Sequence, residues 1–445
     1  TAGTLQEDAL WHNDGDGTFT LVTRAAGIND YSPVQAGMGV DAADYNNDGW
    51  PDIYAGNYLL GNNYLWNNNH NGTFTDLGFE VNVSGDPDYY TDGSGPYYGH
   101  TAGSCWGDYD NDGDLDLWVG NLAHKDIPRA YICDNAQLMK NMGFPFRFED
   151  FKERAGIPSH VDGTINGSYY YDDDTFGGAW CDYDNDGWLD LYVPQVKGYH
   201  TWAWAELWHN NGDGTFTEVG DESGIRVWAG IGCAWADYNN DGQPDHVTEG
   251  TYPYAGPRGL HLFENQGTTN HYLKVKLTGT VSNRAAIGAR LTVSNGNGIQ
   301  IREVEGGSGG HAHQNSLTQG FGFGTYSGTV SLEIRWPSGI VQNVTGITLD
   351  KQINITEDAS GPRITSISAS NYVPNESETV TLSCTVSGSP SSFLWDLQGD
   401  GVFETVQNNN QPVPVSYDKA GRYSPAVKIM NGAGTMAQFE SLQLI

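Results

Sequence analysis

The stretch GDYDNDGDLDLWVGN, residues 107–121, decides how this chain folds. Its acidic part places carboxylates at positions 1, 3, 5 and 9 of a loop, namely Asp108, Asp110, Asp112 and Asp116. The side chains at positions 1, 3 and 5 converge on one point, and Gly113 at position 6 permits the sharp turn that brings the backbone back. Oxygen ligands in this number and spacing suit Ca²⁺, whereas Mg²⁺ demands a stricter octahedron and keeps more water.

The same pattern recurs in one register in the segments ADYNNDGWPDIYAGN (43–57), CDYDNDGWLDLYVPQ (181–195) and ADYNNDGQPDHVTEG (236–250). We number the acidic loops 1 (44–52), 2 (108–116), 3 (182–190) and 4 (237–245). Four matches are too many for chance Asp-rich turns, so we predict about four Ca²⁺ sites with a structural role. The predicted ligands are Asp44, Asn46, Asp48 and Asp52; Asp108, Asp110, Asp112 and Asp116; Asp182, Asp184, Asp186 and Asp190; and Asp237, Asn239, Asp241 and Asp245.

An EF-hand loop shares the first half of this pattern, but it needs a Glu at position 12 and a helix on each side. Position 12 is Ala55, Val119, Val193 and Thr248 in the four loops, and the flanking segments alternate as strands do. The EF-hand interpretation therefore fails on both requirements. The shorter acidic segments at 13–17 and 211–214 lack the later carboxylate and are typical of hairpin turns.

A second element follows each loop, as in AELWHNNGDGTFTEV (205–219), so each repeat predicts about four short strands. A fifth copy of this element, ALWHNDGDGTFTLV (9–22), opens the chain without the first two strands. Repeats of four strands with Gly-rich turns are typical of propeller blades, and they are longer and less uniform than solenoid coils. The half-repeat either completes the sheet of the last repeat or pairs with a neighbouring molecule, because an unpaired strand edge invites partners.

The composition sets limits on the function. The 445 residues carry a net charge of −34, which repels nucleic acid and anionic membranes. No apolar run reaches about 18 residues, so we expect no membrane insertion. The chain begins at Thr1, which we interpret as a processed mature form, and five Cys leave at least one thiol unpaired. We expect buried free thiols and a secreted or cell-surface location. Six sequons are candidates for glycosylation: Asn71, Asn82, Asn166, Asn343, Asn354 and Asn375.

The four repeats resemble FG-GAP/VCBS repeats, the calcium-binding propeller blades of integrin-like and bacterial surface proteins. The segments NHYLKVKLTGTVSNRAAIGARLTV (270–293) and VSLEIRWPSGIVQNV (330–344) resemble the ASPIC/UnbV domain of the cartilage acidic protein type. The segments TLSCTVSG (381–388) and FLWDLQGDG (393–401) resemble a PKD-type immunoglobulin-like sandwich. The resemblance implies an all-β chain with a β-propeller at 1–269, an ASPIC/UnbV-like β domain at 270–358 and a PKD/Ig-like sandwich at 361–445. It implies secretion but no particular activity.

Aromatic residues are unusually frequent in the segments that precede the first strands, where flat rings beside carboxylates suit sugar rings or a protein interface. The candidates are Tyr31, Tyr90, Tyr97, Tyr98, Tyr170, Tyr171, Trp202, Trp204 and Trp228. The pair His311 and His313 offers a transition-metal site, but we favour a surface loop.

The sequence contains no GxSxG, HExxH or P-loop motif, so we predict no catalytic residue. Our leading hypothesis is an extracellular, calcium-stabilised structural or adhesive protein, as a subunit of a surface or filamentous assembly. Its partners are then other protein subunits or cell-surface glycans. A glycan-binding, lectin-like propeller is the alternative. A carbohydrate-active enzyme is the third hypothesis, with Asp172, Asp173, Asp174 and His100 as its candidate residues.

Overall fold

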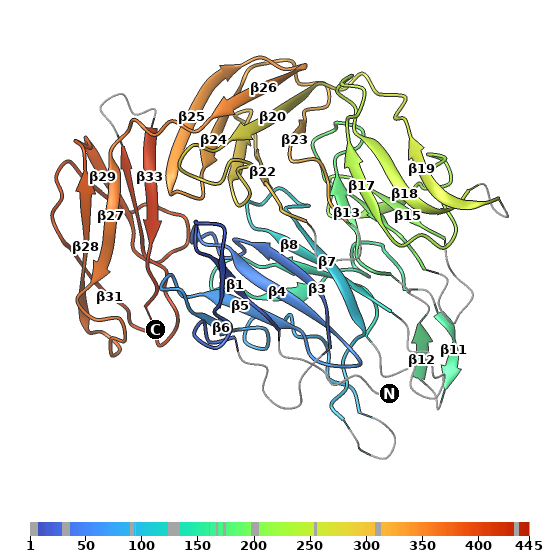
Figure 1. The fold of residues 1–445 in the computed structure, drawn as a ribbon, viewed down its shortest axis with the longest axis horizontal. Coiled ribbons are helices and arrows are strands. Elements are labelled where there is room, and N and C mark those ends of the chain that lie inside the picture. The colour runs from blue at the N-terminus through green and yellow to red at the C-terminus, as the bar shows by residue number, and fades with distance from the viewer. Residues whose placement is uncertain are drawn as a thin grey trace.

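The computed structural model describes residues 8–28, 36–89, 93, 95–122, 134–159, 161–165, 168–171, 175–196, 204–252, 256–307, 313–430 and 436–444, with the backbone alone at 161–165, 168–171 and 436–440. Every regular element in these ranges is a β-strand (Figure 1). They contain no helix long and apolar enough to cross a membrane. The expectation of an all-β chain is therefore confirmed.

Each acidic loop joins the first two strands of an antiparallel sheet, which we call units 1 to 4. Unit 1 contains β3 (Ala36–Ala43), β4 (Asp52–Tyr58), β5 (Tyr64–Asn68) and β6 (Phe74–Asp76). Unit 2 contains β7 (Thr101–Gly107), β8 (Asp116–Asn121), β9 (Gln137–Asn141) and β10 (Phe148–Asp150). Unit 3 contains β13 (Ala179–Cys181), β14 (Asp190–Val193), β15 (Glu206–Asn210) and β16 (Phe216–Glu218). Unit 4 contains β17 (Cys233–Ala236), β18 (Asp245–Thr251) and β19 (Arg258–Phe263), with no fourth strand among the described residues.

Successive units pack face to face and bury the large side chains that alternate along their strands. One core cluster lies between units 1 and 2, a second between units 2 and 3, and a third between units 3 and 4. A backbone bond repeats at two of these junctions, where the turn after one unit accepts from the fourth strand of the next. The N–H of Phe148 donates to the carbonyl of Val81, and the N–H of Phe216 donates to that of Ala155, each at 2.8 Å.

The N-terminal half-repeat forms a separate hairpin of β1 (Trp11–Asn13) and β2 (Phe19–Leu21). It takes the place of a unit before unit 1, because the N–H of Phe74 donates to the carbonyl of Ala26 at 2.7 Å. Leu10 and Ile28 pack on unit 1 from this side. The hairpin does not join the sheet of unit 4, so that alternative is wrong for the described structure. Because the two ends of the row do not pair, a closed propeller ring stays a prediction.

The ASPIC/UnbV-like segment forms its own core of 16 buried apolar residues, with Trp336 and Leu291 among the most buried. One sheet has the order β23 (Gln319–Gly322), β20 (Tyr272–Thr278) and β26 (Lys351–Thr356). The remaining strands are β21 (Arg290–Ser294), β22 (Ile299–Glu303), β24 (Val330–Arg335) and β25 (Ile340–Ile347). We call this segment the middle module.

The C-terminal module has a second core around Trp395, Val427 and Leu382. Its strands are β27 (Arg363–Ala369), β28 (Thr379–Ser387), β29 (Ser392–Asp396), β30 (Thr405–Gln407), β31 (Val413–Ser416), β32 (Ala426–Met430) and β33 (Met436–Ser441). Strands β25 and β33 pair antiparallel and join strands of the two modules in one sheet of eight strands.

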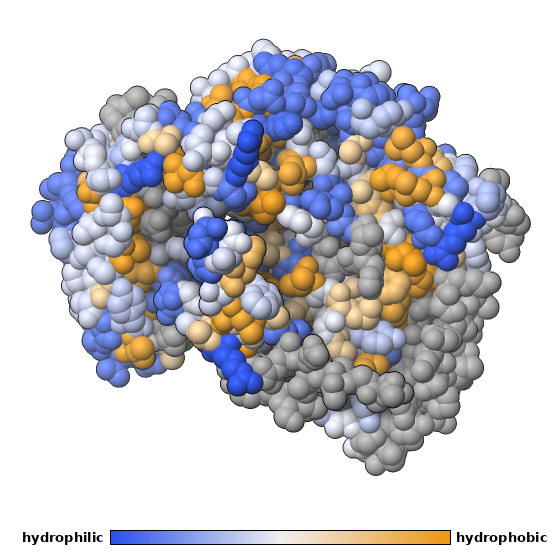
Figure 2. Space-filling model, viewed as in Figure 1, coloured by the Kyte–Doolittle hydropathy of each residue, from blue (hydrophilic) through white to orange (hydrophobic). Residues whose placement is uncertain are grey.

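The backbone hairpin β11 (Val161–Ile165) and β12 (Ser168–Tyr171) extends from units 2 and 3 (Figure 1). Hydrophobic surface is visible over β18 and β19 at the edge of unit 4 (Figure 2).

Candidate metal centres

Two positions of each acidic loop adopt the left-handed backbone conformation. One is the Gly at position 6, as the sequence predicts. The other is an Asn at position 4, which the sequence analysis did not use; φ is 61° at Asn47, 55° at Asn111, 59° at Asn185 and 62° at Asn240. Asn tolerates this region better than other residues with a side chain. The two residues together fold each loop around one point.

The Asn at position 4 also connects each loop to the next one. The amide of Asn111 in loop 2 donates to the carbonyl of Gly187 in loop 3 at 3.0 Å. The amide of Asn185 in loop 3 donates to the carbonyl of Gly242 in loop 4 at 3.2 Å. Asn47 in loop 1 contacts Asp114 of loop 2 at 2.5 Å. The loops therefore form a connected row, which a pattern within a single repeat does not reveal.

The carboxylate at position 9 holds the third strand of its own unit. Its oxygen accepts from a backbone N–H of that strand, at 2.7 Å from Asn68 to Asp52 and at 2.8 Å from Asn141 to Asp116. The equivalent bonds run from Asn210 to Asp190 at 2.8 Å and, two residues after the end of β19, from Asn265 to Asp245 at 2.9 Å. All four position-9 carboxylates are buried. Each therefore closes its loop and fixes the unit around it.

An Asn at or just after the end of the third strand contacts the preceding loop in units 2 to 4. The amides of Asn141, Asn210 and Asn265 donate to the carbonyls of Tyr45, Tyr109 and Tyr183, at 2.9, 2.8 and 2.8 Å. Each of these Tyr residues stands at position 2 of a loop. The sequence shows this Asn in each repeat, but the role of the Asn becomes clear only when its partner in the neighbouring unit is known.

The acidic loops contain buried carboxylate oxygens without a hydrogen-bond partner in the described structure. These atoms are Asp44 Oδ1, Asp52 Oδ2, Asp108 Oδ2, Asp110 Oδ1 and Asp182 Oδ1. A buried polar atom without a hydrogen-bond partner is costly, so a proton or a cation at these oxygens would stabilise the loops. In loops 2 and 3, ligand oxygens of Asp108, Asp110 and Asp116, and of Asp182, Asp184 and Asp186, lie within 4.8 Å of one another. The oxygen-only donor set and its orphaned atoms fit Ca²⁺.

Burial shifts the titration of these carboxyls. It raises the pKa of Asp44 and of Asp108 to about 7, and neighbouring carboxylates add to the effect. Burial also raises the pKa of Asp190 to about 7, against the opposing hydrogen bond from His209. The pKa values of Asp52, Asp116 and Asp182 rise well above the ordinary range for the same reason. At neutral pH the loops without a cation would therefore retain protons.

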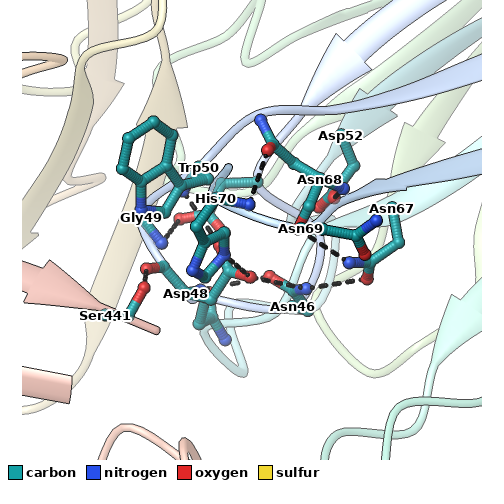
Figure 3. Close-up of polar contacts among 12 residues, drawn as sticks. Asn46, Asp48, Gly49, Trp50, Asp52, Asn67, Asn68, Asn69, His70 and Ser441 are labelled. Carbon is teal, nitrogen blue, oxygen red and sulfur yellow. Dashed lines mark hydrogen bonds and ion pairs between the residues drawn. The ribbon is translucent and has the colours of Figure 1, made fainter. Parts of the chain in front are cut away.

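Loops 1 and 4 carry an Asn at position 3 in place of Asp. In loop 1 the Asn46 amide donates to Asp48 at 3.0 Å, and His70 contacts the same carboxylate at 2.8 Å while stacking on Trp50 (Figure 3). The hydroxyl of Ser441, from the C-terminal module, donates to the carbonyl of Asp48 (Figure 3). Loop 4 repeats the Asn arrangement, with Asn239 donating to Asp241 at 2.9 Å.

Basic side chains lie beside every loop. Within the units, Lys140 pairs with Asp110 and lies 3.3 Å from Asp112, while His209 lies 3.1 Å from Asp190. The hydrogen bond with Asp190 raises the pKa of His209 to about 9. From the middle module, Lys274 pairs with Asp237 of loop 4, and Arg335 lies 3.4 Å from Asp44 of loop 1.

The middle module docks on the row of loops. Buried Arg290 donates to the carbonyl of Asp44 at 3.1 Å and to that of Gly113 at 2.8 Å, so it bridges loops 1 and 2. The N–H of Gly322 donates to Asp182 Oδ2 at 2.9 Å in loop 3. The acidic loops are therefore an internal interface as well as candidate cation sites, which the sequence analysis missed.

The other predicted residues lie apart from the loops. Trp204 and Trp228 pack edge to face, with ring centroids 4.9 Å apart, whereas buried Tyr98 packs near Phe79. Tyr97 pairs its backbone with Asp88. The structure describes Tyr170 and Tyr171 of β12 by backbone only. Tyr31, Tyr90, Trp202, Asn166 and Asp172 to Asp174 lie outside the described residues.

The structure also shows how exposed the predicted sequons, histidines and cysteines are. Of the remaining sequons, Asn71, Asn82, Asn354 and Asn375 are exposed and Asn343 is half-buried. The surface-loop prediction is wrong for His313, which is buried with Nδ1 3.1 Å from the Cys233 sulfur. The described Cys residues, Cys105, Cys181, Cys233 and Cys384, are free thiols.

The C-terminal module contains a further acidic group that the sequence analysis did not single out. Ligand oxygens of Asp396, Asp400 and Glu404 lie within 4.8 Å of one another. The oxygens of Asp396 already accept from the N–H groups of Gly399 at 2.7 Å and Gly401 at 2.8 Å. Because these bonds satisfy the buried carboxylate, the group differs from the orphaned oxygens of loops 1 to 3.

Comparison with known proteins finds similarity in two parts of the chain. An FG-GAP-like repeat model matches residues 2–55, 44–119 and 182–248, and an ASPIC and UnbV model matches residues 279–362. Cartilage acidic protein 1 of Mus musculus is 26% identical over 326 residues, covering 72% of this chain and 44% of that protein. The Xenopus tropicalis protein is 25% identical over 368 residues, covering 80% of this chain and 50% of its own length. The chain thus spans about half the length of these relatives.

One solved structure of similar extent is an Agrocybe aegerita lectin that recognises non-reducing terminal N-acetylglucosamine. The match covers 86% of each chain at 16% identity with a TM-score of 0.27, so the two structures are only distantly similar. The chain thus contains FG-GAP-like repeats and an ASPIC and UnbV segment, and it is similar to cartilage acidic protein 1 over most of its length.

Proposed function

We propose that the chain is an extracellular, calcium-stabilised structural or adhesive protein that serves as a subunit of a surface assembly. The observation that carries the calcium part is the set of orphaned, buried carboxylate oxygens in loops of one register. The similarity to cartilage acidic protein 1, whose name places it in cartilage, supports an extracellular location. We further propose that the units are propeller-type blades and that the protein has no catalytic role.

Calcium would bind through the predicted side chains at positions 1, 3 and 5, with support from position 9. When bound, it would supply the positive charge that the orphaned oxygens lack. This chain's own residues provide the rest: the Asn at position 4 and the Gly at position 6 shape each loop, and the position-9 carboxylate holds the third strand. A cation would thereby stabilise the unit junctions as well as the loop itself.

The metal proposal predicts that calcium raises the melting temperature of the metal-depleted chain. A ligand that binds only the folded state adds roughly 2.7 kcal/mol per site at one hundred times its Kd. Calorimetry with Ca²⁺ or Mg²⁺, together with the bound-metal content by mass spectrometry, measures this directly. Asp182→Asn should reduce the gain, whereas Asp213→Asn, in an exposed hairpin turn, should leave it unchanged. An equal melting temperature with and without calcium, and no bound metal, would overturn the proposal.

The adhesive part rests on the modular architecture and the relatives, so it needs a separate test. Fractionation and immunolabelling of the native source should find the protein on the surface or in the extracellular fraction. A purely intracellular distribution would contradict the proposal. Binding to a glycan array at millimolar calcium would favour surface glycans as partners, whereas an absence of binding would leave protein subunits.

A further inference from the structure

Every unit has two hydrophobic faces, and the row of units shows what each face contacts. The following face packs on the next unit and includes one residue of the second strand and one of the third. These residues are Tyr54 and Leu65 in unit 1, Trp118 and Leu138 in unit 2, and Tyr192 and Leu207 in unit 3; none is more than 1% exposed.

The preceding face packs on the unit before. It contains one residue each from the third and the fourth strand: Met139 and Phe148 in unit 2, and Trp208 and Phe216 in unit 3. These four side chains are at most 5% exposed. The contact between a following and a preceding face is therefore an established interface, repeated within the chain.

The following face of unit 4 is uncovered. Strand pairing places Val247 and Leu262 where unit 3 has Tyr192 and Leu207. Leu262 is 57% exposed and its neighbour Leu260 is 76% exposed, whereas Leu207 is fully buried. Strand β19 has no further neighbour in its described sheet, so its backbone edge is also available.

The preceding face of the N-terminal hairpin is uncovered in the same way. Trp11 corresponds to Trp208 and Phe19 to Phe216, yet they are 55% and 59% exposed. Leu21 pairs with Trp11 at the position where unit 3 has Glu218 paired with Trp208. The hairpin thus presents an extra apolar residue where unit 3 carries an acid, and Leu21 is 55% exposed.

We propose that the two uncovered faces bind each other between copies of this chain, with the hairpin of one copy packed on unit 4 of the next. This rests on the proposed role as an assembly subunit and names its partner and surfaces. The faces lie at opposite ends of the row of units, with β1 and β19 far apart in Figure 1, so one copy does not satisfy both itself. Because the surfaces differ, the contact is head-to-tail and adds further copies in sequence.

The test is the mass distribution of the full chain in calcium, measured by sedimentation and mass photometry over increasing concentration. The unaltered chain should form oligomers. Leu262→Glu and Trp11→Glu should each weaken association about thirtyfold or more, as expected for a central contact. Trp11 is 55% exposed in the single chain, so the hairpin should keep its fold in the Trp11→Glu variant. Val373→Glu, an equally exposed change in the C-terminal module, is the control and should assemble normally.

Mixing the two variants gives the sharper result. The Trp11→Glu copy keeps its unit 4 face, and the Leu262→Glu copy keeps its hairpin face, so the mixture should form dimers and stop there. In addition, Leu21→Cys and Leu262→Cys copies should form a disulfide between chains, which tests the contact even if a Glu variant misfolds. A chain that stays monomeric, variants that assemble normally, or a mixture that stays monomeric overturns the inference. The calcium proposal would survive each of these results, because it is tested by melting.

Discussion

Glu357 illustrates at the residue scale how one carboxylate fixes distant segments of the middle module. Its Oε2 accepts from the N–H groups of Thr280 and Val281 at 2.7 Å and of Ser282 at 2.8 Å. Its Oε1 accepts from the hydroxyls of Ser282 and Ser338. Ser282 lies in segment 270–293 and Ser338 in segment 330–344, so the two segments that resemble the ASPIC/UnbV domain meet at one side chain.

We predict that Glu357→Ala lowers the free energy of unfolding by about 3 kcal/mol, because it removes the acceptor that three backbone N–H groups and two hydroxyls share. Chemical denaturation measures the change. The neighbouring Asp358 is exposed, so Asp358→Ala should have little effect. Burial by itself would raise the pKa of Glu357, but these hydrogen bonds together hold it below its usual value. The contribution of Glu357 to stability is therefore present above about pH 4.5 and is lost as the pH falls. Equal stability of the two variants would contradict this role.

The docking of strand β23 on loop 3 belongs to the scale of elements. A Cβ atom added at Gly322 would lie 2.3 Å from Asp182 Oδ2 and 2.3 Å from the carbonyl carbon of Asn185. A Cβ added at Gly320, two residues earlier in the same strand, would meet nothing within 4 Å. The two glycines therefore form a matched pair, and only one of them is required by a close approach of two backbones.

We expect Gly322→Ala to cost about 3 kcal/mol by forcing β23 away from loop 3. The same change should weaken calcium binding at loop 3, because Asp182 loses its contact with the Gly322 N–H. Gly320→Ala should change neither property substantially. Denaturation and calcium titration of both variants measure the difference. If Gly322→Ala proved as stable as Gly320→Ala, the module would not dock on the loop in this way.

At the scale of the whole molecule, the net charge of −34 and the connected row of loops make stability depend on pH. Burial raises the pKa of Asp44 and Asp108 to about 7 in the metal-free fold, against about 3.9 in an unfolded chain. The folded state then binds more protons than the unfolded state between these values. Stability of the metal-free chain should therefore fall as the pH rises from about 4 to about 7.

Calcium competes with those protons, so its stabilising effect should grow over the same pH window. Melting temperatures of metal-depleted and calcium-loaded protein at pH 5, 6, 7 and 8 measure both trends. The gap between the two forms should be widest at pH 8. A gap that is constant with pH would show that the loop carboxyls do not retain protons in the absence of calcium.

The sequence predicted the acidic loops and their flanking strands well, because the residue patterns that specify them span only a few neighbouring residues. The spacing of Asp and Gly within nine residues fixes each turn, and alternation of apolar residues fixes the flanking strands. The loops therefore fall between the first two strands of units 1 to 4, as the register of the repeats predicts. Residues whose role depends on a neighbouring unit were missed, such as Asn111 and Asn141, because their partners are 76 and 96 positions away in the chain.

By itself the sequence determined an all-β chain built of repeated acidic loops, because turn chemistry and strand periodicity act over a few residues. Only the tertiary structure decided what surrounds the loops, with Arg290 between loops 1 and 2 and Gly322 against loop 3. It also decided that His313 is buried beside Cys233. It also decided that β25 and β33 merge two modules and that the row of units ends in two uncovered faces. The physical reason is that burial and docking depend on contacts between distant segments, which local spacing does not encode.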